Sequence, residues 1–194
     1  MGDSQFHFLG TARDVDSVYL GVYRAEGYRA VGGYNPKLLR TEDDDINARL
    51  RDAGLRIRLD PAIRSRYLCR DTIPAIWRQY AGYGYWKVAL ATIRPSALRV
   101  RHLIPAVIVI VLAVAMVTAV AGLWIPLAVM LTIYRVAALG FPFWAEPRSL
   151  VDVMLFPVVT ATMHFAYGVG TLFALPRWRA LRERVGGAVT RADA

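Results

Sequence analysis

The densest run of reactive side chains in this sequence is acidic and comprises Glu42, Asp43, Asp44 and Asp45. The run follows Thr41, a residue type that favours helix N-caps, and Asp44 stands three positions further on, so we expect a short capped helix. A carboxylate in the first turn of a helix is held ionised by the dipole and nearby amides, with a low pKa. The residues alone leave two interpretations open: a modest proton acceptor, or a solvated acidic helix start.

The surrounding residues predict a mixture of helix and strand. The helix begun at Thr41 is expected to end at Gly54, and the alternation of apolar and basic residues over Leu55–Leu59 predicts a half-buried strand. Upstream, Val15–Tyr23 is rich in Val and Tyr and predicts another strand, followed by a short helix over Arg24–Val31. We therefore expect the acidic run to lie in an α/β region.

Cysteine chemistry is limited because Cys69 is the only cysteine. No internal disulfide can form, and no cysteine cluster can hold zinc or an iron–sulfur centre. A reducing, cytosol-facing location fits this composition. The first residues, Met1–Gln5, lack the basic region and apolar run of a secretory signal, so we expect later segments to direct membrane insertion.

Polarity is segregated along the chain. The net charge is +9 and the hydrophobic fraction is 56%, yet residues 1–102 hold 17 of the 24 basic and 11 of the 15 acidic side chains. Residues 103–175 hold four charged side chains, Arg135, Glu146, Arg148 and Asp152. This division predicts a water-facing half followed by a membrane-embedded half.

The apolar half predicts three transmembrane segments. Residues 103–121 contain no charge and are long enough for a helix to cross a bilayer core of about 30 Å. After Gly122, residues 123–141 continue apolar apart from Arg135, and residues 150–175 form the third segment. We interpret Arg135 as a side chain that extends to the membrane interface, and His164 as a packing residue without a ligand role.

The flanks of these segments create a conflict. Pro142–Ser149 predicts an interfacial loop, and residues 176–194 predict a basic cytoplasmic tail by the positive-inside rule. If the water-facing half is also cytoplasmic, three full crossings would leave the basic tail outside. Either the third segment is re-entrant or the tail breaks the rule.

A helix is predicted from Asp71 to about Arg94, with Pro74 at an early position. Its aromatic and cationic side chains alternate, which is typical of a helix at a membrane interface, so residues 70–102 are interpreted as an interfacial region. The basic residues flank apolar segments, where anionic lipid accounts for them, and no nucleic-acid-binding motif is present. We therefore expect membrane lipid as a partner and no nucleic acid.

The acidic run and its flanks resemble the family 2 glycosyltransferases of the GT-A fold. Thr41-Glu42-Asp43 opening a helix resembles the family's "ED" segment, and Val31-Gly32-Gly33-Tyr34-Asn35 resembles the "GGF(D/N)" turn before it. The run from Gln79 to Lys87 occupies the place of the family's Gln-rich interfacial motif. The likeness covers essentially the whole chain and is greatest to membrane-bound succinoglycan-biosynthesis glucosyltransferases.

This resemblance implies a fold and a set of site residues. The fold would be an α/β partial GT-A domain, its C-terminal, acceptor-side part, over residues 1–69, followed by interfacial helices and an all-α transmembrane region. Asp43 would be the general base of an inverting transfer, supported by Glu42. Gln79, Tyr83 and Trp86 would lie on the acceptor and diphosphate side, although Gly82-Tyr83 replaces the Arg-Trp that usually ends the motif.

The resemblance also implies a divalent metal, Mg²⁺ or Mn²⁺, for the complete enzyme, with ligands outside this chain. The family's nucleotide-binding half and its Asp-x-Asp metal motif have no counterpart, because Asp14-Val15-Asp16 lies on the acceptor side of the resemblance. No metal ligand is assigned. A chain of this extent is expected to be inactive alone.

Two functions are compatible with these observations. The first is a hexosyltransferase acting from a nucleotide-sugar donor on a polyprenyl-linked or polysaccharide acceptor in exopolysaccharide biosynthesis. The second is a non-enzymatic membrane subunit that anchors or organises other polysaccharide-synthesis or export proteins. Both predict a multi-pass protein of the bacterial inner membrane with a cytoplasmic N-terminal half. A small transporter ranks last, because the apolar segments offer few polar side chains.

Overall fold

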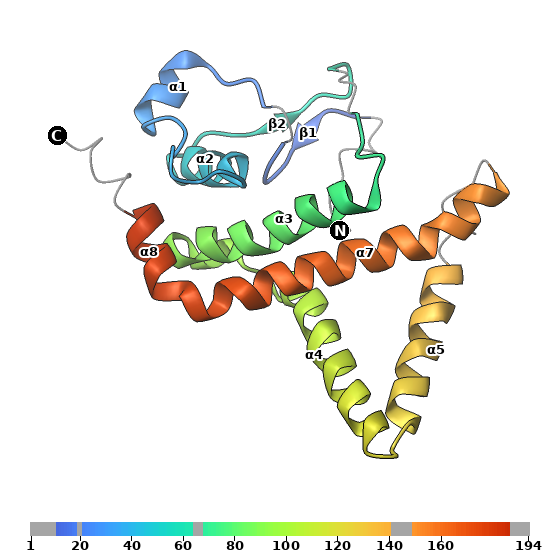
Figure 1. Cartoon of the computed structure of the whole chain (residues 1–194). Helices are drawn as coiled ribbons and strands as arrows, with labels where there is room; N and C mark the ends of the chain where they lie inside the picture. The colour runs from blue at the N-terminus through green and yellow to red at the C-terminus, as the bar shows by residue number, and fades with distance from the viewer. Residues whose placement is uncertain (1–10, 19–20, 64–67, 141–148, 187–194) are drawn as a thin grey trace. The chain divides into compact units, whose positions relative to one another are not determined.

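A computed structural model of the chain describes residues 11–18, 21–63, 68–140 and 149–186. The chain divides into two compact units. The first unit comprises Met1–Cys69, Trp86–Ala97 and Arg177–Ala194, and the second comprises Arg70–Tyr85 and Leu98–Pro176. Helices dominate the described residues (Figure 1).

The first unit is assembled from segments that are distant in sequence. Its helices are α1 (Ala25–Ala30), α2 (Glu42–Asp52), the second half of α3 (Ile73–Ile93), the short 3₁₀ turn η2 (Pro95–Ala97) and α8 (Trp178–Gly186). Two strands, β1 (Arg13–Asp14) and β2 (Arg58–Leu59), pair antiparallel with Arg13 opposite Leu59. The buried core of this unit includes Leu38, Ile46 and Leu50.

The prediction of an α/β partial GT-A domain over residues 1–69 is wrong. In the described residues of the first unit the only sheet is the two-residue pair of β1 and β2, and residues 15–18 and 21–23 are not strand. A Val- and Tyr-rich segment becomes a strand only where neighbouring strands supply hydrogen-bond partners, and two strands alone are marginal. Here Val15 donates one backbone hydrogen bond to Ile57 (2.9 Å), and the ladder ends.

The expected helix after Thr41 is confirmed, but its cap differs. Helix α2 begins at Glu42, ends at Asp52, and buries Ile46 and Leu50. Thr41 makes no side-chain capping bond and has a left-handed backbone with φ of 64°. The side chain of Asp44, expected to complete the cap, instead binds Lys87 in α3.

The second unit consists of the first half of α3 with α4 (Val100–Val120), α5 (Ile125–Gly140) and α7 (Leu150–Ala174), followed by the 3₁₀ turn η3 (Leu175–Arg177). Helices α4 and α5 form a V that closes at Gly122 (Figure 1), whose φ of 90° makes the tight turn predicted there. The loop predicted over Pro142–Ser149 lies almost entirely outside the described residues.

Two helical segments in the described residues are long and apolar enough to cross a membrane. They are α4, with mean hydropathy 3.0 over its most apolar window, and the run Leu150–Gly186, with 1.5. Only 11% and 6% of these windows are buried within the protein, whereas the core helix of a soluble protein would be mostly buried. The second predicted span forms the shorter apolar helix α5, of 16 residues.

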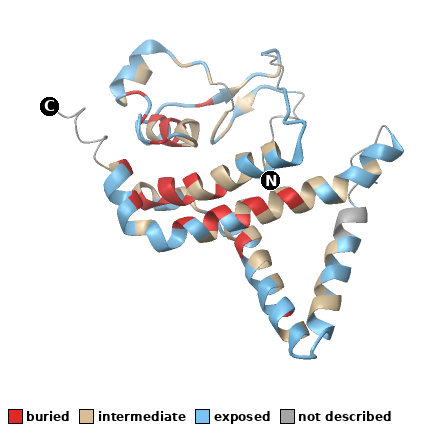
Figure 2. Ribbon diagram, viewed as in Figure 1, coloured by how far each residue is buried: buried red, intermediate tan, exposed pale blue. Residues whose placement is uncertain are grey.

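Small residues bring the helices of the second unit into backbone contact. A side-chain carbon on Gly84 of α3 would overlap the carbonyl oxygen of Tyr167 in α7, and one on Gly170 would overlap that of Ala81. Such close approach is typical of helices in membranes, where packing rather than hydrophobic burial drives association. Figure 2 shows buried residues in the second half of α7, and among them are Ala166, Gly168 and Gly170.

Candidate functional site

The backbone at the start of α2 has an unfavourable conformation. Thr41 is the only described residue other than glycine with a positive φ, and a β-branched side chain is poorly tolerated in that region. The Thr41 hydroxyl donates to the Arg40 carbonyl (2.5 Å) and to the Trp86 carbonyl (3.4 Å). Strain of this kind persists where surrounding structure fixes it, and it clusters at functional sites.

Asp45, the last acidic residue of the run, has a structural role. Its side chain is 2% exposed and accepts hydrogen bonds from the Arg49 guanidinium at 2.7 and 3.0 Å. Arg94 of the α3 C-terminal segment approaches its other oxygen at 3.7 Å. Arg49 also donates to the carbonyls of Val31 and Gly33, so this ion pair fixes the preceding turn to α2.

Asp44 is also neutralised by a cation. Lys87 of α3 donates to Asp44 Oδ2 at 2.6 Å, and Ser17 donates to Oδ1 at 3.3 Å. The buried amide of Asn47 extends this network, because it donates to Ser17 Oγ at 2.9 Å and accepts from the Tyr23 hydroxyl at 3.1 Å. The network joins the first turn of α2 to Lys87 of α3, to Ser17 and to Tyr23.

Asp43 differs from its two neighbours. Its carboxylate is half-buried and accepts a hydrogen bond from the Asp44 amide at 2.8 Å, but no cation pairs with it among the described residues. Burial raises the pKa of Asp43, the charge of Asp44 and that of Glu42 raise it further, and the amide hydrogen bond lowers it. The low pKa expected from helix position is therefore wrong, because desolvation and like charges outweigh the amide.

Tyr23, which interacts electrostatically with Asp43, belongs to a cluster of three tyrosines in the first unit. The Tyr23, Tyr28 and Tyr34 rings lie 5.6 to 6.2 Å apart between centroids. Burial raises the pKa of Tyr23, and its neighbour Tyr34 and the charge of Asp43 raise it further. The Tyr23 hydroxyl therefore stays protonated, and it donates a hydrogen bond to Asn47.

The other residues selected from the sequence fall in both units. Trp86 belongs to the first unit with Asp43, is 8% exposed, and stacks beneath Arg184, whose guanidinium carbon is 5.4 Å from the ring centroid. Gln79 and Tyr83 belong to the second unit, where the Gln79 amide donates to the Tyr83 hydroxyl at 2.7 Å. Glu42 is half-buried in the first turn of α2.

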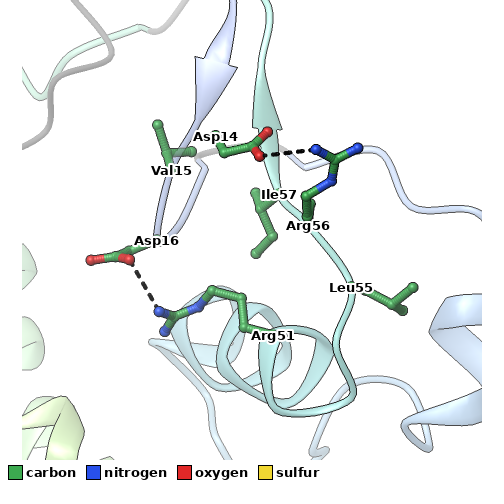
Figure 3. Close-up of a pocket in the computed structure, with 7 residues that line it drawn as sticks. All are labelled: Asp14, Val15, Asp16, Arg51, Leu55, Arg56 and Ile57. Carbon is green, nitrogen blue, oxygen red and sulfur yellow. Dashed lines mark hydrogen bonds and ion pairs between the residues drawn. The ribbon is translucent and has the colours of Figure 1, made fainter.

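The described residues contain no set of side chains placed to bind a divalent metal ion. No group of three or more His, Cys, Asp or Glu side chains among those residues is placed to hold an ion. Asp14 and Asp16, which have Asp-x-Asp spacing, line an open pocket of about 260 Å³, and each is paired with an arginine. Asp16 meets Arg51 at 3.1 Å and Asp14 meets Arg56 at 3.6 Å (Figure 3).

Comparisons with family models, with curated proteins and with solved structures find no match to this chain. The functional argument therefore depends on the chain's own residues. Sequence reasoning missed Lys87 and Asn47 as partners in the acidic run's network. Asn47 lies one helical turn after Asp43, so the two side chains share a face of the helix, and this spacing was the available signal in the sequence.

Proposed function

We propose that this chain carries the acceptor-side part of a membrane-bound, inverting sugar transferase in which Asp43 is the general base. The observation that carries the proposal is the contrast within one helical turn. Asp44 and Asp45 are neutralised by cations, whereas Asp43 has no cationic partner among the described residues and has a raised pKa. The similarity of Thr41-Glu42-Asp43 to the "ED" segment gives this base its substrate class.

A raised pKa suits the proposed role. A general base works best when its pKa approaches the operating pH, because it is then both ionised and able to hold the proton it takes. The acceptor hydroxyl attacks the anomeric carbon, the bond from that carbon to the diphosphate oxygen breaks, and the electron pair leaves with the nucleoside diphosphate. The hydroxyl proton passes to Asp43. The hydroxyl becomes acidic only as the new bond forms, so positioning outweighs basicity.

The neighbouring contacts supply that positioning. The Asp44–Lys87 ion pair and the buried Asp45–Arg49 pair fix the first turn of α2, and with it the Asp43 backbone. Glu42 supports the base through its charge, which raises the pKa of Asp43. By resemblance, Trp86, which belongs to the same unit as Asp43, contributes to the acceptor and diphosphate side.

The donor half of the reaction lies with other residues. By the resemblance, the nucleotide-sugar and the Mg²⁺ or Mn²⁺ that the family uses would be bound by ligands outside this chain. When bound, such an ion neutralises the leaving diphosphate. The acceptor is lipid-linked or part of a growing exopolysaccharide, since the chain carries helices long enough to cross the bacterial inner membrane, and the basic flanks of those helices support a cytoplasmic site.

Sugar transfer by membranes tests the proposal. Asp43→Asn is introduced at the chain's own locus, so that any partner polypeptide is present, and transfer from labelled nucleotide-sugars to membrane lipid is measured. Loss of a general base costs about 10²- to 10⁴-fold in rate. We expect a decrease of that size with an unchanged amount of chain in the membrane.

Asp52→Asn is the matched control, because Asp52 is an exposed aspartate of the same helix. It should retain transfer within a factor of two or so, since exposed ion pairs contribute about 0.2–1 kcal/mol. Wild-type transfer by Asp43→Asn would contradict the proposal and would favour a non-enzymatic subunit that anchors a polysaccharide-synthesis or export assembly.

A further inference from the structure

The C-terminal helix α8 packs into the first unit, although 79 residues of the second unit, Leu98–Pro176, precede it. Its apolar side chains Leu181 and Val185 are 2% and 0% exposed. The buried Asn35 side chain donates to the Val185 carbonyl at 3.1 Å. Asn35 therefore joins the turn before α2 to the last described turn of the chain.

Two further contacts fix the same helix to the segment that precedes the apolar region. The Arg184 guanidinium lies over the Trp86 ring of α3, and a side-chain carbon on Gly186 would lie 3.6 Å from Ile93. α8 thus contacts two parts of the first unit that are distant in sequence, around Asn35 and in the second half of α3. Its place is set by buried groups rather than by an exposed surface.

We propose that the chain enters the membrane after residue 97 and leaves it before residue 177 at the same face. It therefore crosses the bilayer an even number of times. The first unit is rich in charged side chains and belongs in water. The chain leaves this unit after Ala97 and returns to it at Arg177, and α4 and α7 lie between these points. The second apolar run, Leu150–Gly186, begins with α7 and continues into the first unit. An odd number of crossings would place α8 across the bilayer from Asn35.

The charges beside the apolar helices lead to the same conclusion independently. Arg99 and Arg101 lie at the start of α4, and Arg177, Arg179 and Arg182 follow α7. Positively charged residues close to the ends of membrane helices are retained on one face, so both flanks are assigned to that face.

The length of α5 agrees with an even count. Three crossings would require α5 to span the bilayer together with α4 and α7. Its 16 residues rise about 24 Å, which is short of a hydrocarbon core of about 30 Å. If this segment is not a full span, the conflict among the sequence-based expectations disappears, because both basic flanks then lie on one face.

The exposed single cysteine provides the test. Cys69 lies in the first unit and reports the face of that unit. In a Cys69→Ser background, Glu183→Cys reports the face of α8 and Ala121→Cys reports the end of α4; both positions are exposed. Each variant is treated with a membrane-impermeant maleimide in sealed right-side-out and inverted vesicles, and labelling is repeated after detergent solubilisation.

We expect Cys69 and the Glu183→Cys thiol to be labelled in the same vesicle orientation. The Ala121→Cys thiol should resist labelling in that orientation and react once detergent is added. Labelling of positions 69 and 183 in opposite orientations would overturn the proposal, as would labelling of position 121 from the face of Cys69. The Cys69→Ser protein sets the background, and the readout does not depend on sugar transfer.

Discussion

The two units of this chain are stabilised by different interactions. The first unit holds its segments together with ion pairs, among which Asp45–Arg49 is nearly excluded from solvent. The second unit holds its helices together through small residues that allow backbone contact, such as Gly84 against Tyr167 and Gly170 against Ala81. The first pattern is typical of a protein in water, and the second of helices in lipid.

This difference is the one that two different solvents, water and lipid, are expected to produce. In water, apolar burial drives folding and buried charges require partners, so the first unit pairs its acidic run with Arg49, Arg94 and Lys87. In lipid there is no hydrophobic force between apolar helices, and close packing takes its place. Substitutions should therefore affect the two units by different mechanisms, and the following predictions test that comparison from the largest expected effect to the smallest.

The largest effect is expected at the buried ion pair. Asp45→Asn leaves the Arg49 and Arg94 guanidiniums without their shared carboxylate, and breaking a buried pair costs about 3–5 kcal/mol. Chemical denaturation of the purified chain in detergent, followed by tryptophan fluorescence, measures this loss. Asp52→Asn is the control, because the Asp52 side chain is 67% exposed and the loss of its ion pair with Arg94 should lower the free energy of unfolding by only about 0.2–1 kcal/mol.

The next effect is expected in the second unit, at the contact of α3 with α7. In Gly84→Ala the added carbon overlaps the backbone of Tyr167, and forced overpacking costs about 1–3 kcal/mol. The shift should appear in thermal unfolding of the chain in detergent. Gly140→Ala has open space around the added carbon and should leave the midpoint unchanged. Equal midpoints for the two variants would contradict the close contact.

A smaller effect on stability is expected from Lys87→Met. The Lys87–Asp44 pair is partly exposed, so its loss should cost about 1 kcal/mol or less. Because this pair positions the first turn of α2, sugar transfer should fall by more than the folded fraction does. Lys87→Arg keeps the charge and should recover part of the rate. If the rate of sugar transfer by Lys87→Met falls only in proportion to the folded fraction, then Lys87 does not position the first turn of α2 for transfer.

The smallest effect concerns the pH dependence of stability at Asp43. The pKa of Asp43 is raised above 3.8, so between that value and the raised value the folded state binds more protons than the unfolded state. Stability therefore falls as pH rises through this window. Asp43→Asn should be more stable than the wild type at pH 7 and equal to it below pH 3.8 or so. A loss of stability at pH 7 would contradict the raised pKa.

Local features of the fold were predictable from the sequence. The helices over residues 42–52 and 73–93 and the turn at Gly122 follow from turn residues and hydrophobic spacing, which act over a few positions. The strand expected over residues 15–23 failed because a strand requires partners that are distant in sequence. The cap expected at Thr41 failed because Asp44 binds Lys87, 43 residues away.

The candidate site was predictable in its residue types but not in its electrostatics. The helix position of Asp43 predicted a low pKa, since the dipole and amide act locally. Its burial depends on contacts between residues that are distant in sequence, which no short sequence pattern encodes. The same contacts decide which of the three adjacent aspartates pair with a cation and which one does not.

The central claim is that Asp43 alone among these aspartates is left chemically available, and parallel Asn variants test it most directly. Initial rates of sugar transfer are measured in membranes carrying Asp43→Asn, Asp44→Asn or Asp45→Asn and are divided by the amount of folded chain. We predict a decrease of about 10²-fold or more for Asp43→Asn, with undiminished stability. A normalised rate for Asp43→Asn equal to that of the wild type would contradict the account.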